Sequence, residues 1–111
     1  EPLATLRTAV DPSTAAFAAA DLDAVVHLSF ADLPCREYLL QMLTDAEVHG
    51  WDLATALGQD RTLDPEVVDV LLPSVIEQQE LIRGSGMFGA EVPVPADADP
   101  AVRLLALLGR E

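Results

Sequence analysis

The sequence is poor in positive charge and in long apolar runs, and each shortage excludes a class of partner. Six basic residues stand against nineteen acidic ones in 111 residues, which gives a formal net charge of -13. This charge opposes binding to the phosphate backbone of nucleic acids and to anionic lipid surfaces. No apolar run approaches the roughly 20 residues that a membrane-spanning helix needs. We therefore expect no nucleic-acid partner and no membrane partner.

Cysteine is nearly absent as well. The single Cys35 leaves no pair for an intramolecular disulfide, which fits a reducing compartment. No base is assured beside it, so we expect an inert thiol rather than a nucleophile. The first residues, EPLATLRTAV, lack the basic and then apolar layout of a signal peptide, and the chain begins at Glu1 rather than at methionine. We expect a cytoplasmic protein, either processed or preceded by a further segment.

What the sequence does contain is enough apolar material for one small helical core. Half of the residues are apolar, and at this length residues 1–111 are expected to form a single, mostly α domain. Asp-Pro pairs begin at Asp11, Asp64 and Asp99, and each precedes apolar residues at helical spacing. Because Asp can cap a helix and proline suits the first helical position, each pair predicts a helix start.

The apolar spacing and the turn residues divide the chain into helices joined by irregular segments. Residues 2–20 are expected to form either one helix kinked at Pro12 or two short helices. Residues 24–30 alternate in polarity, which indicates either a short strand or hairpin or an extended connection. Further helices are expected over residues 34–57, over residues 65–83 with a kink at Pro73, and over residues 100–108, with a turn-rich irregular segment over residues 84–98.

The helix predicted over residues 34–57 is apolar on more than one side. Leu40 and Trp51 lie away from its main apolar stripe, and we expect Trp51 to pack in the core rather than to line a cleft. Such a helix needs several neighbours, and the chain supplies few, so one flank is expected to stay open for a second copy in a homodimer or for an N-terminal segment. The stripe comprises Cys35, Leu39, Met42, Leu43, Ala46, Gly50, Leu53 and Leu57.

Asp45 and His49 are the candidate site residues. They are four residues apart in the predicted helix, so their side chains project from the same face. Asp52 falls on the same line, whereas Glu47 projects to nearly the opposite side. A carboxylate and an imidazole one turn apart offer two ligands to a divalent metal, although a site normally has three or more. The same spacing also suits an ion pair or hydrogen bond that only stabilises the helix.

Two stretches carry a resemblance to a known family. The segment LTDAEVHGWDLATALGQDRTLDPEVV contains an acid, three residues, a His, one residue and then Trp-Asp-Leu-Ala. The tail MFGAEVPVPADADPAVRLLALLGRE contains Phe-Gly, Val-Pro-Val-Pro, Arg-Leu-Leu and Gly-Arg. Both resemble the DinB-like, mycothiol-dependent maleylpyruvate isomerase-type metal-binding family, and the resemblance covers roughly the last three quarters of the chain.

The resemblance implies a four-helix bundle in which Asp45 and His49 bind a divalent metal, zinc foremost, together with a His from an earlier helix. It further implies mycothiol as a thiol cofactor and a small-molecule substrate, as in isomerases or thiol transferases, with the reaction itself unassigned. Residues 1–33 do not resemble the family's N-terminal helices, and His27 matches no ligand position. The alternative is a non-catalytic helical interaction or dimerisation module with a degenerate metal site.

Overall fold

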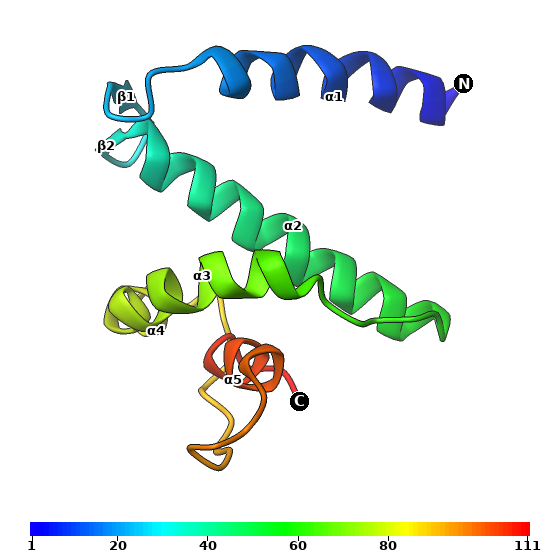
Figure 1. The fold of residues 1–111 in the computed structure, drawn as a ribbon, viewed down its shortest axis with the longest axis vertical. Coiled ribbons are helices and arrows are strands. Elements are labelled where there is room, and N and C mark those ends of the chain that lie inside the picture. Colours follow the sequence, from blue (N-terminus) through cyan, green and yellow to red (C-terminus); the bar gives the residue numbers. More distant parts are fainter. The chain divides into compact units, whose positions relative to one another are not determined.

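The computed structural model describes all 111 residues and is mostly helical, as expected (Figure 1). Contacts divide the chain into two compact units, Glu1–Gln41 and Met42–Glu111, and one helix, α2, runs through both. None of the helices combines the length and the apolarity that crossing a lipid bilayer requires. The elements in chain order are α1 (Pro2–Ala19), β1 (Val25–His27), β2 (Asp32–Pro34), α2 (Cys35–Leu57), α3 (Pro65–Glu77), α4 (Gln79–Ser85) and α5 (Pro100–Leu107).

Two of the three Asp-Pro pairs begin helices. The Asp64 side chain caps α3 by accepting a backbone hydrogen bond, and Asp99 is the N-cap residue of α5. The prediction of a helix start at Asp11 is wrong, because this pair lies inside α1. There the Glu1 carboxylate accepts hydrogen bonds from two backbone N–H groups of the first turn, so the helix begins at Pro2 and continues through Asp11.

A small hairpin precedes α2 in the Glu1–Gln41 unit. Strands β1 and β2 are antiparallel, and His27 lies opposite Asp32, with Nδ1 2.9 Å from Oδ1. Of the two alternatives expected for residues 24–30, a short strand or an extended connection, the structure has the strand, over Val25–His27. The helix that follows begins at Cys35, whose backbone N–H donates to the carbonyl of Ala24 at 2.7 Å. This contact satisfies one of the unpaired N–H groups at the helix start.

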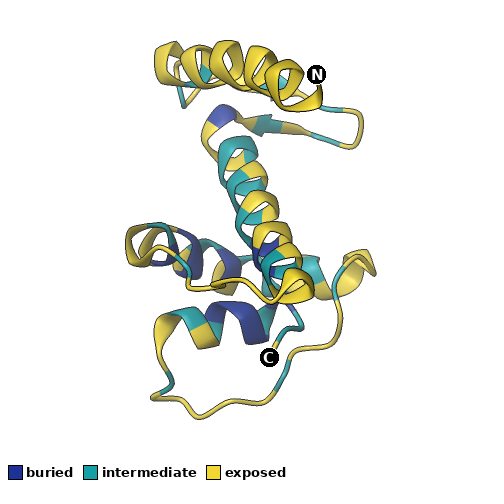
Figure 2. Cartoon of the chain, turned by 90° about the vertical axis from the view of Figure 1, so that its right-hand side faces the viewer, coloured by how far each residue is buried: buried dark blue, intermediate teal, exposed yellow.

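The core of the Met42–Glu111 unit lies where α3 packs on α5 (Figure 2). Helix α2 contributes Val48 and Trp51. Trp51 is buried as expected, but it also lines a cleft, contrary to the expectation from the sequence. By contrast, Leu53 and Leu57 of the predicted apolar stripe are 61% and 60% exposed. The other buried apolar residues of this unit are Val68, Leu71, Leu72, Val75, Leu104, Leu105, Ala106 and Leu108.

The helix predicted over residues 65–83 is two helices in the structure. Helix α3 continues through Pro73 to Glu77, and the chain leaves helical geometry at Gln78, where φ is -99° and ψ is 9°. The break therefore comes after the proline at which a kink was predicted. Helix α4 then ends at Gly86, whose φ of 71° is the left-handed conformation that glycine adopts without strain. As predicted, the segment between α4 and α5 contains neither helix nor strand.

Candidate functional site

Helix α2 carries both predicted metal ligands. It runs without a proline or a break from Cys35 to Leu57, which places Asp45 and His49 one turn apart. Both residues are exposed, and the His49 side chain is 67% accessible. No group of three or more His, Cys, Asp and Glu side chains is arranged to hold a metal ion. The structure thus offers two neighbouring donors in solvent, and metal binding by them stays a prediction.

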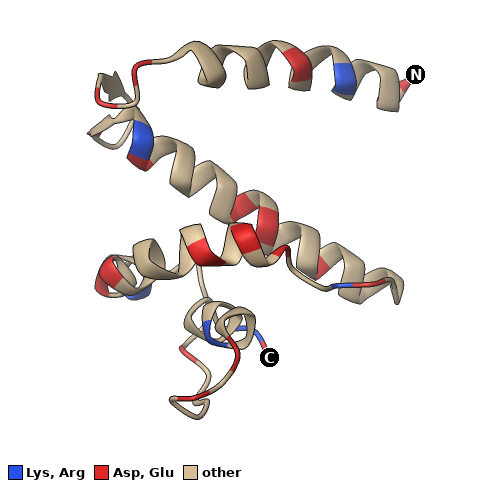
Figure 3. Cartoon of the chain, in the orientation of Figure 1, with Lys and Arg blue, Asp and Glu red and all other residues tan.

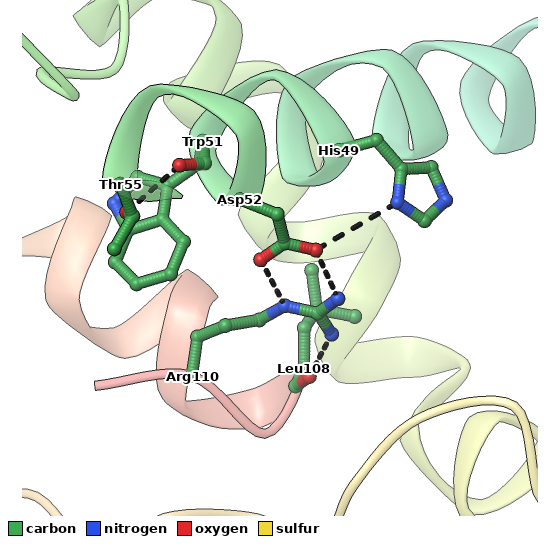
Figure 4. A network of polar contacts seen from close by, with 6 residues as sticks. All are labelled: His49, Trp51, Asp52, Thr55, Leu108 and Arg110. Atoms are coloured by element: carbon green, nitrogen blue, oxygen red, sulfur yellow. Dashed lines mark hydrogen bonds and ion pairs between the residues drawn. The ribbon is translucent and has the colours of Figure 1, made fainter. Parts of the chain in front are cut away.

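The imidazole of His49 faces a second carboxylate. Its Nδ1 lies 3.7 Å from Oδ2 of Asp52, three residues further along α2 (Figure 4). This distance suits an ion pair and exceeds that of a hydrogen bond. Because Nδ1 is directed at Asp52, Nε2 is the ring nitrogen of His49 that is available to bind a metal ion.

Asp52 is itself held by Arg110. The guanidinium donates from Nε to Oδ1 at 3.0 Å and from Nη2 to Oδ2 at 2.6 Å, and Nη1 donates to the carbonyl of Leu108 at 2.7 Å (Figure 4). Such a two-pronged contact fixes the plane of the carboxylate. It joins α2 to the residues that follow α5 and orients the oxygen that His49 faces.

The Arg110 contact also sets the charge of Asp52. The hydrogen bonds from Arg110 lower the pKa of this carboxyl below its usual value; partial burial opposes the shift, while the charges of Arg110 and His49 add to it. In return, the hydrogen bond to Asp52 raises the pKa of Arg110. Asp52 is therefore a carboxylate throughout the neutral range, in a chain whose acidic residues far outnumber its basic ones (Figure 3).

The segment between α4 and α5 packs against the same C-terminal residues. The Arg110 guanidinium lies 5.8 Å from the centroid of the Phe88 ring, within cation–π range. Next to it, the backbones of Gly89 and Gly109 approach so closely that a Cβ on Gly109 would lie 2.9 Å from Gly89. These contacts hold the irregular segment next to the ion pair between Asp52 and Arg110.

The other residues considered from the sequence lie elsewhere. His27 pairs with Asp32 in the hairpin, and Cys35 is a free, buried thiol. The sequence does not identify Arg110 as a site residue, although the Gly-Arg ending is part of the family resemblance. Its partner is 58 residues away in the sequence, so no local pattern pointed to the pair.

Comparison with known proteins gives two relatives. No protein-family model matches the chain, and no solved structure matches it. The chain is similar to the uncharacterized protein MT0763 of Mycobacterium tuberculosis strain CDC 1551 / Oshkosh and to the uncharacterized protein Rv0738 of strain H37Rv. Each is 36% identical over 91 residues, which cover 80% of this chain and 50% of the relative. The chain therefore spans about half the length of the curated relatives it matches.

Proposed function

We propose that this chain belongs to a cytoplasmic divalent-metal-binding protein of the DinB-like type, in which Asp45 and His49 supply two of the metal ligands. One observation carries the proposal. The two side chains stand exposed and one turn apart on an unbroken helix, with Nδ1 of His49 facing a carboxylate that Arg110 holds in place.

The position of Asp52 distinguishes Asp45 and His49 from an exposed acid–histidine pair that only stabilises its helix. A metal-binding histidine usually directs its second ring nitrogen at a carboxylate or carbonyl, which fixes the tautomer and the orientation of the ring. Asp52 stands in that position relative to His49, and its low pKa keeps it charged. The pair Asp45 and His49 therefore presents a carboxylate oxygen and Nε2 as donors.

Zinc suits such a donor set, but two ligands do not complete a site. Catalytic zinc sites usually hold three protein ligands and keep one position open. The third ligand would come from a second copy or from a segment outside these residues. A metal bound there would act as a Lewis acid toward water, a thiol such as mycothiol, or a substrate oxygen.

Zinc binding tests the proposal directly. We expect the chain of residues 1–111 to bind Zn²⁺ weakly in calorimetric titration, because two ligands give an incomplete coordination shell. His49→Ala should weaken the binding by about tenfold or more, since it removes the nitrogen donor. The matched control is His27→Ala, which removes the chain's other histidine and should leave the affinity unchanged. Equal affinities of His49→Ala and the unaltered chain would refute the assignment.

A second candidate is a non-catalytic dimerisation module, and one feature favours it. No residue of α1 is buried, and Leu3, Leu6 and Val10, at three- and four-residue spacing on one face, are each about half exposed. Exposed apolar faces of this kind commonly mark interfaces on soluble proteins. A two-fold pairing of α1 with a second copy would cover this face.

Light scattering tests whether the chain is a dimer, as a dimerisation module requires, or a monomer. We expect a mass of twice 11.8 kDa, and more dimer as salt is added, because salt screens the repulsion between two chains of charge -13. Leu6→Glu should shift the chain toward monomer by placing a charge in the apolar face. Thr8→Glu adds the same charge on the opposite side of α1 and serves as the control. A monomeric mass at high salt would exclude the dimerisation module.

A further inference from the structure

A cleft of about 150 Å³ opens along α2, on the side that projects away from His49. Its α2 wall contains Ala46, Gly50 and Ala54, which recur every four residues and leave no long side chain to fill the space. A Cβ placed on Gly50 would meet no atom within 4 Å. Trp51 and the loop between α2 and α3 complete the walls. The cleft therefore lies wholly within the Met42–Glu111 unit.

One wall carries a positive charge without a counter-charge. The Arg61 guanidinium lies 4.8 Å from the centroid of the Trp51 ring, and Nη1 donates to the Thr55 hydroxyl at 3.3 Å. Arg61 takes part in none of the ion pairs of this strongly acidic chain. Asp60, a second carboxylate that lines the cleft, does not pair with Arg61 and accepts instead from the backbone and hydroxyl of Thr62, at 2.9 and 2.7 Å. The remaining donors of Arg61 are thus available to a ligand.

The α2 wall carries a negative charge that also lacks a counter-charge. Glu47 lines the cleft, is half-buried, and forms no ion pair with Arg61 or with any other basic side chain. Because Asp60 is engaged with Thr62, Arg61 and Glu47 are the two charged groups of the cleft without a partner, and a ligand that carries both charges at once matches them. A guanidinium binds a carboxylate through two parallel hydrogen bonds, and a carboxylate accepts from an ammonium group.

We propose that this cleft binds a small zwitterion of the α-amino acid class. The ligand's carboxylate lies on Arg61, its ammonium group on Glu47, and its side chain against Trp51 and the small residues of α2. A water occupies roughly 30 Å³ in the liquid, so a cleft of about 150 Å³ has room for a molecule the size of about five waters. The assignment uses none of Asp45, His49 and Asp52 and stands independently of the metal proposal.

Trp51 is the only tryptophan, so its fluorescence reports on the cleft. The unaltered chain is titrated with L-alanine, L-valine and L-leucine, and with propionate and ethylamine as probes that carry one charge each. We expect a saturable change with the amino acids and at least tenfold weaker binding of either single-charge probe. Propionate or ethylamine binding as tightly as the amino acids, or no saturable response to any amino acid, would overturn the proposal.

Variants locate the binding within the cleft, with calorimetry as a second readout because Arg61 touches the fluorophore. Arg61→Gln and Glu47→Gln should each weaken amino-acid binding by about tenfold or more, as expected for the loss of one charge-assisted contact. Gly50→Leu should abolish binding by filling the space, and circular dichroism shows whether the helix is intact. Arg7→Gln, which changes the charge equally on α1, is the control. Undiminished binding in both Arg61→Gln and Gly50→Leu would overturn the assignment.

Discussion

Alanine at position 109 is expected to destabilise the Met42–Glu111 unit by about 3 kcal/mol. Gly109 has a φ of +80°, and a side chain in the left-handed region costs about 1–2 kcal/mol. The new Cβ would also lie 2.9 Å from three backbone atoms of Gly89, which cannot rotate away as a side chain would. Overpacking of this kind costs about 1–3 kcal/mol more. Urea unfolding followed by Trp51 fluorescence measures the loss.

Substitutions at two other glycines separate the conformational cost from the cost of overpacking. Gly58 has a φ of +65° and no neighbour within 4 Å of a built Cβ, so Gly58→Ala should cost only the conformational part, about 1–2 kcal/mol. Gly50 lies within α2 with open space around it, and Gly50→Ala should stabilise the unit by about 0.5–1 kcal/mol. If Gly109→Ala and Gly58→Ala cost the same, the close approach of Gly89 and Gly109 contributes nothing.

Replacing Asp52 by asparagine is expected to lower the free energy of unfolding by about 1–2 kcal/mol. The substitution removes a carboxylate that accepts two charge-assisted hydrogen bonds, and it leaves a guanidinium that is only 20% exposed without its counter-charge. Removing one partner of a fully buried pair costs about 3–5 kcal/mol. Asp52 is 38% exposed, so water screens part of the attraction and the expected loss is smaller.

Asp45→Asn is the matched control for this variant. It removes a carboxylate from the same helix, but Asp45 is exposed and belongs to no ion pair, so the free energy of unfolding should change by less than about 0.5 kcal/mol. Equal losses in the two variants would mean that Arg110 does not stabilise the unit through Asp52.

The contribution of Asp52 to the free energy of unfolding depends on pH, and the direction of its pKa shift determines how. The folded pKa lies below the usual value of an aspartate, so the contribution is present above that usual value and is lost as the pH falls through the folded pKa. The difference in stability between the unaltered chain and Asp52→Asn should be constant from neutral pH down to about pH 5 and should shrink below it. A difference that closes above pH 5 would contradict the lowered pKa.

The features that the sequence alone determined are those whose causes lie within a few residues. Helix α2 follows from a long stretch without proline, and it ends before Gly58, which takes a positive φ. Helix α5 begins directly after Asp99, and the positions of Asp45 and His49 on one helix follow from their spacing. Predictions failed where the local signal was ambiguous: a proline tolerated inside α1 looked like a helix start, and α3 broke at Gln78 rather than at Pro73.

Only the tertiary structure decided which residues act together across long separations. Asp52 and Arg110 meet because α2 and the residues after α5 belong to the same unit, and their spacing of 58 residues leaves no periodic trace in the sequence. The cleft beside Gly50 likewise needs the loop after α2 to bring Arg61 over the Trp51 ring. Helical periodicity shows which side chains share a face, whereas the partner of that face depends on packing between distant segments.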